Sequence, residues 1–221
     1  ELIALNDERK HETQTAVDKI LSKYTAPPTA DVIVEYNPDC HESVAGIAAG
    51  RIKDAFYKPT IVLTDSHDGG EYIKGSARSV EGFDIFKRLM TVKDILVKFG
   101  GHPMAAGLTL RKADLGEFIR RVNEPEWPAE AERFRRVTID AALYFSAITK
   151  NTVNELDLIE PCGKGNRKPV FAAKNIKVRK IAVLGKNRNA VKMTLEDPTA
   201  EAEGIWFGDG DRLIDDMNGL S

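Results

Sequence analysis

The segment Gly100-Gly101-His102 carries the most distinctive chemistry in the sequence, because a glycine pair precedes a histidine between two apolar stretches. Paired glycines adopt backbone angles closed to other residues and let a ligand approach the main chain. A histidine beside them can donate a hydrogen bond to an anion and can change charge near neutral pH. The same residues are also typical of a tight turn before a buried strand, predicted at 105–110, in which His102 would be purely structural.

Two other segments supply donors that suit a phosphate group. Ser76 and Arg78 lie in a small, polar strand predicted at 72–79, although an edge strand with a glycine bulge has a similar composition. Arg51 follows Val44 by seven residues within the apolar stripe of a predicted helix. An arginine there is costly unless it reaches an anion or a carboxylate, or extends outward from the helix edge. Guanidinium and hydroxyl groups hold phosphate oxygens well, so these residues indicate a phosphate-binding surface.

Positive charge is concentrated in the second half of the chain. Residues 161–195 contain no Asp or Glu and ten Lys or Arg residues, whereas the whole 221-residue chain has a net charge of −2. A basic tract in an otherwise acidic chain predicts contact with a nucleic-acid backbone, although a solvated lysine-rich sheet edge is an alternative. We expect the nucleic-acid track to include Lys164, Arg167, Lys168, Lys177, Arg179, Lys186 and Arg188. The candidate base-stacking side chains are Tyr144, Phe145, Phe171 and Trp206.

Composition and motifs argue against several other classes of function. No apolar run reaches the roughly 20 residues that a membrane-spanning helix needs, and the chain opens on a charged helical pattern rather than a signal peptide. Cys40 and Cys162 lie far apart, which favours a reducing, intracellular setting. Paired carboxylates at metal-ligand spacing, a Gly-x-x-x-x-Gly-Lys loop and a nucleophile elbow are all missing from the sequence. We therefore expect neither a metal site nor a complete catalytic site in this chain.

Hydrophobic periodicity places the candidate residues on alternating helices and strands in the first half of the chain. A helix at 1–24 ends before two prolines, and a second helix runs to about residue 57. Short helices at 83–90 and 92–98 are predicted to lead into the glycine pair, and an amphipathic helix follows at 115–122. The other strands expected here are 31–36 and 60–64.

A change of character at 124–130, where two prolines interrupt any periodicity, predicts a domain boundary. Beyond it the sequence predicts a strand at 137–148 and a short helix at 149–158. Three more strands are expected at 170–184, 190–196 and 201–207. Many short strands with one small helix favour a small barrel.

Several of these motifs, taken in order, resemble a known family. Four segments are similar to successive signatures of the DHH-associated domain of the RecJ single-strand-specific exonucleases: Ala49-Gly50-Arg51-Ile52, Lys58-Pro59-Thr60-Ile61-Val62-Leu63, Lys74-Gly75-Ser76-Ala77-Arg78-Ser79 and Phe99-Gly100-Gly101-His102. The glycine-rich segment at 158–171 resembles a turn in that family's OB-fold domain. The resemblance covers nearly the whole chain.

The resemblance implies a fold and a domain order. It implies a connector helix at 1–28 from an absent N-terminal DHH domain, and then an α/β DHH-associated domain at 29–126, with a mixed sheet flanked by helices. An all-β OB-fold-like barrel would follow at 127–221, and we expect it to be truncated after four of five strands. In this family the DHH domain holds Mn²⁺ or Mg²⁺. The sequence has no Asp-His-His motif, so we expect this fragment to bind no metal and to be inactive alone.

The resemblance also implies a function. The chain would be the single-stranded-DNA-binding portion of a 5′→3′ exonuclease that acts in DNA repair and recombination, in the cytoplasm and away from membranes. Single-strand binding protein and other repair proteins are candidate partners. The resemblance implies that His102 reaches the scissile phosphate, and that the DNA phosphates are gripped by Arg51, Ser76, Arg78, Gly100 and Gly101.

Two other functions stay open at this point. The wider DHH group includes phosphodiesterases for short oligonucleotides and dinucleotides, although a dinucleotide needs no long basic tract. A non-catalytic module that recruits replication or repair proteins is the other alternative. The sequence of residues 37–42 differs from the one usual in bacterial relatives of the family.

Overall fold

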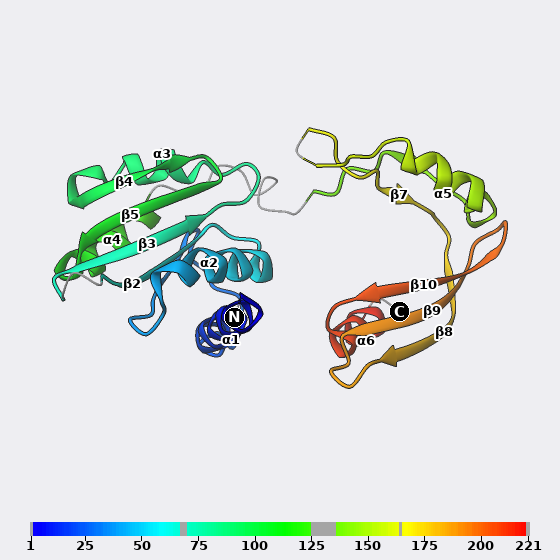
Figure 1. Ribbon diagram of the computed structural model, residues 1–221, viewed down its shortest axis with the longest axis horizontal. Helices are drawn as coiled ribbons and strands as arrows, with labels where there is room; N and C mark the ends of the chain where they lie inside the picture. Colours follow the sequence, from blue (N-terminus) through cyan, green and yellow to red (C-terminus); the bar gives the residue numbers. More distant parts are fainter. Residues whose placement is uncertain (1, 67–69, 125–135, 164, 220–221) are drawn as a thin grey trace. The chain divides into compact units, whose positions relative to one another are not determined.

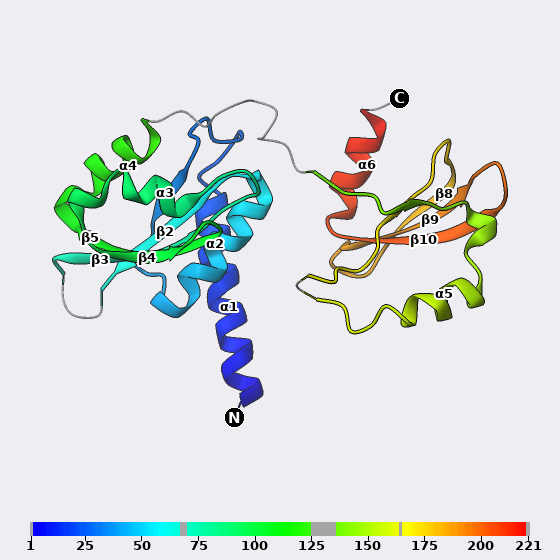
Figure 2. The ribbon, with the colours of Figure 1, turned by 90° about the horizontal axis from the view of Figure 1, so that it is seen from above.

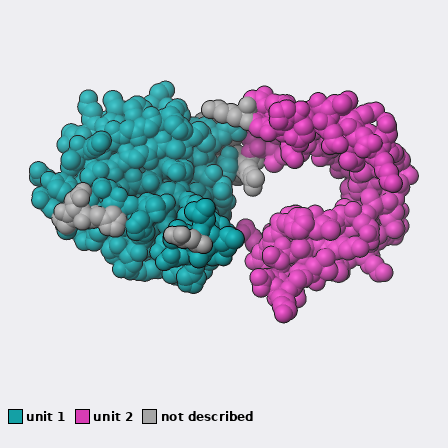
Figure 3. Space-filling model, viewed as in Figure 1, with its two compact units in different colours: residues 1–135 teal, residues 136–221 magenta. Residues whose placement is uncertain are grey.

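The computed structural model describes residues 2–66, 70–124, 136–163 and 165–219. The chain forms two compact units, residues 1–135 and 136–221, coloured separately in Figure 3. The boundary expected between residues 126 and 127 falls within 125–135, outside the described residues. Each unit is therefore considered by itself.

Unit 1 is a five-stranded sheet with helices on both faces (Figures 1 and 2). The strand order is β1-β2-β3-β5-β4, with β1 and β2 parallel and the other neighbours antiparallel. The strands are β1 (Ile33–Tyr36), β2 (Thr60–Asp65), β3 (Tyr72–Arg78), β4 (Leu96–His102) and β5 (Ala105–Arg111). The helices are α1 (Leu2–Leu21), α2 (Glu42–Phe56), α3 (Ile85–Met90) and α4 (Leu115–Asn123), with single 3-10 turns at η1 (Lys93–Ile95) and η2 (Lys112–Asp114).

The two faces of this sheet carry separate apolar clusters, because successive strand residues point to opposite faces. Val62 of β2 packs with Ile52 of α2 on one face, whereas its neighbour Ile61 packs with Phe118 of α4 on the other. Helix α2 lies over β2 and β3. Beyond β3 the α2 face is open, since Lys98 and Gly107 there are exposed.

The helix predicted at 92–98 is wrong, because only η1 is helical and β4 begins at Leu96. Short apolar runs fit a helix and a strand almost equally well, and pairing with β5 decides between them here. The glycine pair and His102 therefore belong to a strand, and the chain turns only after His102. The strand at 105–110 and the helix at 115–122 are confirmed as β5 and α4.

Unit 2 contains a three-stranded antiparallel sheet, ordered β10-β9-β8. Its strands are β8 (Lys177–Leu184), β9 (Ala190–Glu196) and β10 (Glu201–Phe207), and a short parallel pair joins β6 (Ala141–Ala142) to β7 (Phe171–Ala172). The helical segments are η4 (Phe145–Ala147), α5 (Lys150–Asp157) and α6 (Gly210–Asn218). The described strands form no closed barrel.

Three features of unit 2 differ from the sequence prediction. The strand expected at 170–184 is divided into β7 and β8, and residues 173–176 between them are not in a strand. The strand expected at 137–148 is reduced to β6 followed by the 3-10 turn η4. The sequence prediction omitted α6, although Asp209 caps its first turn by accepting hydrogen bonds from the N–H groups of Asp211 and Arg212. Helix α6 packs against the sheet, since a Cβ on Gly210 would contact Val183 and Val191.

Asp197 ties the turn between β9 and β10 to the segment at residue 145. Its carboxylate is 5% exposed and accepts hydrogen bonds from the N–H groups of Phe145 at 2.6 Å, Thr199 at 2.7 Å and Ala200 at 2.9 Å. Burial alone would raise the pKa of Asp197, but these bonds and one from the Thr199 hydroxyl lower that pKa to about 2. The turn is therefore held by a carboxylate that must be ionised.

Acidification is expected to loosen unit 2 through this carboxylate. A group whose pKa is depressed in the folded state stabilises the fold above its unfolded pKa, and this stabilisation is lost as the pH falls through the folded value. The free energy of unfolding of unit 2 should therefore fall between about pH 4 and pH 2. Asp197→Asn should lower stability at neutral pH and flatten this dependence in urea titrations, whereas Asp157→Asn on the exposed side of α5 should do neither. An unchanged pH profile in Asp197→Asn would contradict this role.

No helix in the described part of the chain is both long and apolar enough to cross a membrane.

Candidate nucleic-acid interface

The sheet register of unit 1 brings three of the predicted anion donors onto one face. Arg78 pairs with Ala105 of β5, and Ala105 pairs with His102 of β4, so the three lie in one row across the sheet. Ser76 lies in the next row of the same face. Paired residues on adjacent strands point the same way, about 4.8 Å apart per strand, so Arg78 and His102 stand about 10 Å apart. Strand pairing thus gathers residues that are distant in sequence.

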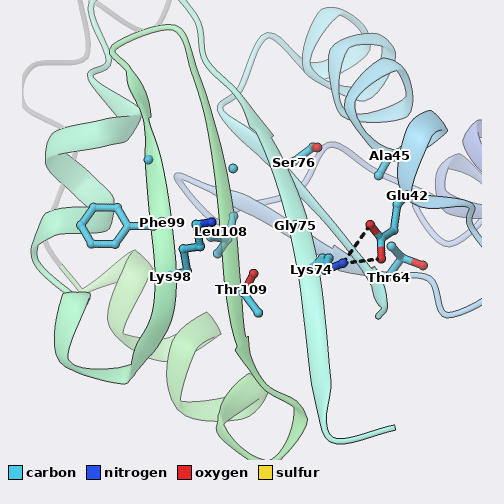
Figure 4. Close-up of a pocket in the computed structure, with 12 residues that line it drawn as sticks. Glu42, Ala45, Thr64, Lys74, Gly75, Ser76, Lys98, Phe99, Leu108 and Thr109 are labelled. Carbon is cyan, nitrogen blue, oxygen red and sulfur yellow. Dashed lines mark hydrogen bonds and ion pairs between the residues drawn. The ribbon is translucent and has the colours of Figure 1, made fainter. Parts of the chain in front are cut away.

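A groove of about 410 Å³ lies on this face between α2 and the outer strands (Figure 4). Its floor is small and polar because Ser76, Gly107 and Gly100 form a single row across β3, β5 and β4. The residues lining it are Glu42, Ala45, Thr64, Lys74, Gly75, Ser76, Lys98, Phe99, Gly100, Gly107, Leu108 and Thr109. The groove therefore has little side-chain bulk along its floor.

Arg78 and Ser76 converge at Gly46 on α2. A Cβ on Gly46 would lie 2.7 Å from Nη2 of Arg78 and 3.5 Å from Oγ of Ser76, so the glycine makes room for the guanidinium. Nη1 of Arg78 donates to the carbonyl oxygen of Ala77 at 2.8 Å. Within the described ranges, Arg78 forms no ion pair with a carboxylate. Its positive charge is therefore available to an anion, and a guanidinium can grip one with two parallel hydrogen bonds.

His102 is exposed at the end of β4, and a hydrogen bond from the main chain of Met104 orients its ring. Its Nδ1 accepts a hydrogen bond from the N–H of Met104 at 3.3 Å. The neutral ring consequently carries its proton on Nε2, which can donate to an oxygen of a bound group. This arrangement suits contact with a phosphate.

The two glycines before His102 have different roles. Gly101 has φ +152, and a Cβ on it would lie 2.4 Å from the carbonyl oxygen of Ala105 and 2.5 Å from Cα of Ala106. Gly101 is therefore required by the β4–β5 hairpin. A Cβ on Gly100 would meet no atom within 4 Å, so the fold does not require glycine there. The effect of Gly100 is that no side chain covers the groove floor at this position.

Arg51 does not join this group. It is exposed, and its Nη1 donates to Oε1 of Gln14 on α1 at 2.7 Å. With 3.6 residues per helical turn, Arg51 points well away from Gly46, which faces Arg78. Of the two interpretations of Arg51 that the sequence left open, the structure agrees with the one in which the side chain extends outward from the edge of α2, here toward α1.

The structure adds groove residues that the sequence prediction omitted. Lys98, Thr109 and Gly107 share the face of Ser76, and Lys98 forms no ion pair within the described ranges. Lys74 also lines the groove, but Glu42 holds its Nζ at 3.0 Å (Figure 4). The alternation of β4 would have identified Lys98 with Gly100 and His102, had this segment been predicted as a strand.

In unit 2 the three arginines of the predicted basic track form ion pairs, whereas two of its described lysines do not. Arg167 contacts Asp140 at 2.9 Å, Arg179 contacts Glu196, and Arg188 donates to Asp211 at 2.7 Å. Among the lysines, Lys168 lies 3.6 Å from Glu160, whereas Lys177 and Lys186 form no ion pair with a described residue. Lys164 lies outside the described residues. The carboxylates all come from outside residues 161–195, so the absence of acids within that tract did not mean that its arginines were unpaired.

These ion pairs keep their carboxylates charged. Hydrogen bonding from Arg188 lowers the pKa of Asp211, and hydrogen bonding from Arg179 lowers the pKa of Glu196. A phosphate would have to displace a charged carboxylate to reach either arginine. The lysines without partners are therefore the more accessible cations of unit 2.

The described residues contain no group of three or more His, Cys, Asp or Glu side chains placed to hold a metal ion. The donor set of the groove is cationic and neutral rather than anionic, apart from Glu42, which holds Lys74. Such a set fits phosphate oxygens and does not fit a divalent cation.

Comparisons with known proteins agree with this division into two units. Residues 29–125 match the DHHA1 domain family, and residues 139–219 match the RecJ OB domain family. The single-stranded-DNA-specific exonuclease RecJ of Bacillus subtilis is 33% identical over 96% of the chain and 27% of the relative, and that of Haemophilus influenzae is 31% identical over 84% and 33%. The chain thus spans about a third or less of the length of these relatives.

Solved structures give the same result. The crystal structure of RecJ from Thermus thermophilus in complex with Mg²⁺ matches 91% of the chain with a TM-score of 0.71 and 28% identity. The complex of the same protein with Mn²⁺ matches 92% with a TM-score of 0.73. The chain covers 30% and 29% of these two structures.

Proposed function

The chain belongs to the RecJ family, and from this premise we propose that it is the portion of a 5′→3′ single-strand-specific exonuclease that binds single-stranded DNA. The observation that carries the proposal is the guanidinium of Arg78, which has no carboxylate partner among the described residues and converges with Ser76, a residue of the groove floor, at Gly46. A phosphodiester carries one negative charge and several acceptor oxygens, which these donors complement.

The residues of unit 1 would act on a phosphate in distinct ways. Arg78 would bind two phosphate oxygens, Ser76 would donate its hydroxyl hydrogen, and His102 would donate from Nε2 at the far side of the row. Gly100 would let the sugar-phosphate chain approach the sheet backbone. Together they would fix the position of the sugar-phosphate chain relative to the hydrolytic groups of the longer enzyme. Repair and recombination of DNA are the processes in which such an activity would serve.

The metal chemistry of this activity is proposed to lie outside the described residues. The two Thermus thermophilus RecJ structures are complexes with Mg²⁺ and with Mn²⁺, and a divalent ion bound to such an enzyme would activate water and stabilise the leaving oxygen. The groove does not supply ligands for such an ion. The contribution of this chain would therefore be binding and orientation.

A nuclease assay with Mn²⁺ tests the proposal against its alternative, a phosphodiesterase for dinucleotides. A longer form that includes the rest of the family's length should degrade long single strands in preference to dinucleotides, and this chain alone should degrade neither. Preferential cleavage of dinucleotides would favour the alternative and contradict the proposal. A binding module without catalysis is indicated if the longer form binds single strands and hydrolyses nothing.

The lysines of unit 2 are expected to determine the salt dependence of binding. Removing one lysine that binds a phosphate should make the slope of log K against log salt less negative by about 0.7 for a single strand. Lys186→Gln should produce such a change. The control is the double variant Arg188→Gln with Asp211→Asn, which keeps the net charge of the chain. Arg188 lies in the loop between β8 and β9, like Lys186, and Asp211 lies in α6. This double variant should leave the slope unchanged. The reverse result would assign the phosphate to Arg188.

A further inference from the structure

The outer face of the three-stranded sheet in unit 2 carries an aromatic ring in an unusual environment. Exposure alternates along β10, so Glu203, Ile205 and Phe207 point outward while Trp206 is half-buried on the other face. Phe207 is 78% exposed and Ile205 is 55% exposed. Consecutive aromatic residues thus have opposite environments, and only Trp206 contributes to the interior.

Helix α6 lies on the face opposite Phe207. Trp206 pairs with Val191, and Val191 pairs with Val183, and a Cβ on Gly210 of α6 would contact both valines. Phe207 instead shares a row with Ala190 and Leu184. Ala190 and Leu184 are both apolar, and they leave the ring of Phe207 largely exposed. A flat partner can therefore approach the ring.

Positive charge accompanies the exposed ring. Lys180 and Lys192 lie on the same face as Phe207, in rows closer to the middle of the sheet, and Lys186 lies in the loop that joins β8 to β9 next to the ring's row. Lys192 holds Glu203 at 2.7 Å, which neutralises the nearest carboxylate of β10. Lys180 and Lys186 form no ion pair with a described residue. The other two carboxylates of this face, Glu196 and Glu201, pair with each other at the end of the strands opposite Phe207. The charge nearest the ring is therefore positive and favours an anionic ligand there.

We propose that Phe207 is a base-stacking residue for single-stranded DNA on the outer face of β8, β9 and β10. The inference rests on the proposed function and adds to it a binding residue in unit 2. A nucleobase presents a flat face of its own, and stacking on an aromatic ring beside lysines that follow the backbone is how single strands are held without sequence preference. A protein partner would also cover the ring, and the experiment below separates the two occupants.

The test compares Phe207→Leu and Phe207→Trp in the full chain. Binding of a labelled single strand longer than the roughly 4–16 nucleotides that one OB fold occupies is measured by fluorescence anisotropy at several salt concentrations. Phe207→Leu should weaken binding about tenfold without changing the salt slope, because stacking releases no counterions. Phe207→Trp should bind as the parent chain does. Leu158→Ala, at an 84% exposed site on another segment of the unit, should have no effect.

A strand of the same length that lacks its bases provides the decisive comparison. Phe207→Leu should bind this abasic strand as well as the parent chain does, because no base remains to stack. If Phe207→Leu loses no affinity for the normal strand, or loses equal affinity for both strands, the stacking role is overturned while the proposed function stands. If the parent chain itself binds neither strand even at low salt, both the stacking role and the proposed function fail. Unchanged thermal unfolding of Phe207→Leu checks that the exposed ring does not contribute to the fold.

Discussion

Replacing Arg78 by alanine is expected to reduce the affinity for single-stranded DNA by roughly 10- to 100-fold, the largest effect of any single side chain in unit 1. A hydrogen bond to a charged group contributes about 1.5–3 kcal/mol, and a guanidinium can form two to one phosphate. No carboxylate of the described residues competes for Arg78, so its full charge meets the ligand. The dissociation constant and its salt dependence are measured by anisotropy with a labelled strand.

Arg51→Ala is the matched control for this experiment. Both substitutions remove one guanidinium from unit 1, so they change the net charge equally, but Arg51 contacts Gln14 of α1 instead of the groove. Arg51→Ala should therefore weaken binding only slightly. Equal losses from the two variants would mean that general electrostatic attraction dominates and that the groove has no special role. A larger loss from Arg51→Ala would move the binding surface to the α1 side of α2.

Gly101→Ala should destabilise unit 1 by about 3 kcal/mol, whereas Gly100→Ala should leave its stability nearly unchanged. A methyl group on Gly101 would overlap the backbone of β5, and φ +152 is a conformation that alanine rarely adopts. The methyl group on Gly100 would enter open space. Urea unfolding, followed by a signal from unit 1, measures both values.

For DNA binding the order of the two glycine variants should be reversed, when the affinity is compared for folded chains only. Gly100→Ala places a methyl group on the groove floor between Lys98 and His102, so it should weaken single-strand binding about tenfold in a chain of parental stability. Gly100→Ala with parental affinity would show that the strand does not lie on this floor. Gly101→Ala with parental stability would contradict the hairpin geometry.

The sequence predicts the chemistry of the groove better than its geometry. Residue type alone identifies Ser76, Arg78 and His102, but only the β3–β5–β4 register places them on one face. Register depends on long-range pairing, which a local pattern does not encode. For the same reason the sequence prediction places Lys98 in a helix and misses its position beside Gly100.

For the basic tract at 161–195, the sequence predicts the residue types correctly but not how many of their charges are free of ion pairs. Residues 161–195 predict an uninterrupted positive surface because no acid occurs among them. Folding brings Asp140, Glu196 and Asp211 against the three arginines of the tract. Charge counted along the chain therefore overestimates the charge that a ligand meets. The distinction between arginines and lysines becomes visible only from the side-chain contacts.

Two local patterns in the sequence indicate features of unit 2 that the sequence prediction omitted. Asp209 precedes an apolar pattern at Leu213, Ile214 and Met217, which is typical of a capped amphipathic helix, and α6 forms there. The alternation in β10 likewise places Phe207 on the face opposite Trp206. Which of the two faces is covered depends on α6, so the exposure of Phe207 required the structure.

Single-strand binding by this chain is tested by the fluorescence anisotropy of a labelled single strand and of the matching duplex, each titrated with the chain at several salt concentrations. We expect preferential binding of the single strand, with an affinity that falls steeply as salt rises. Equal or tighter binding of the duplex, or no binding of the single strand even at low salt, would contradict it.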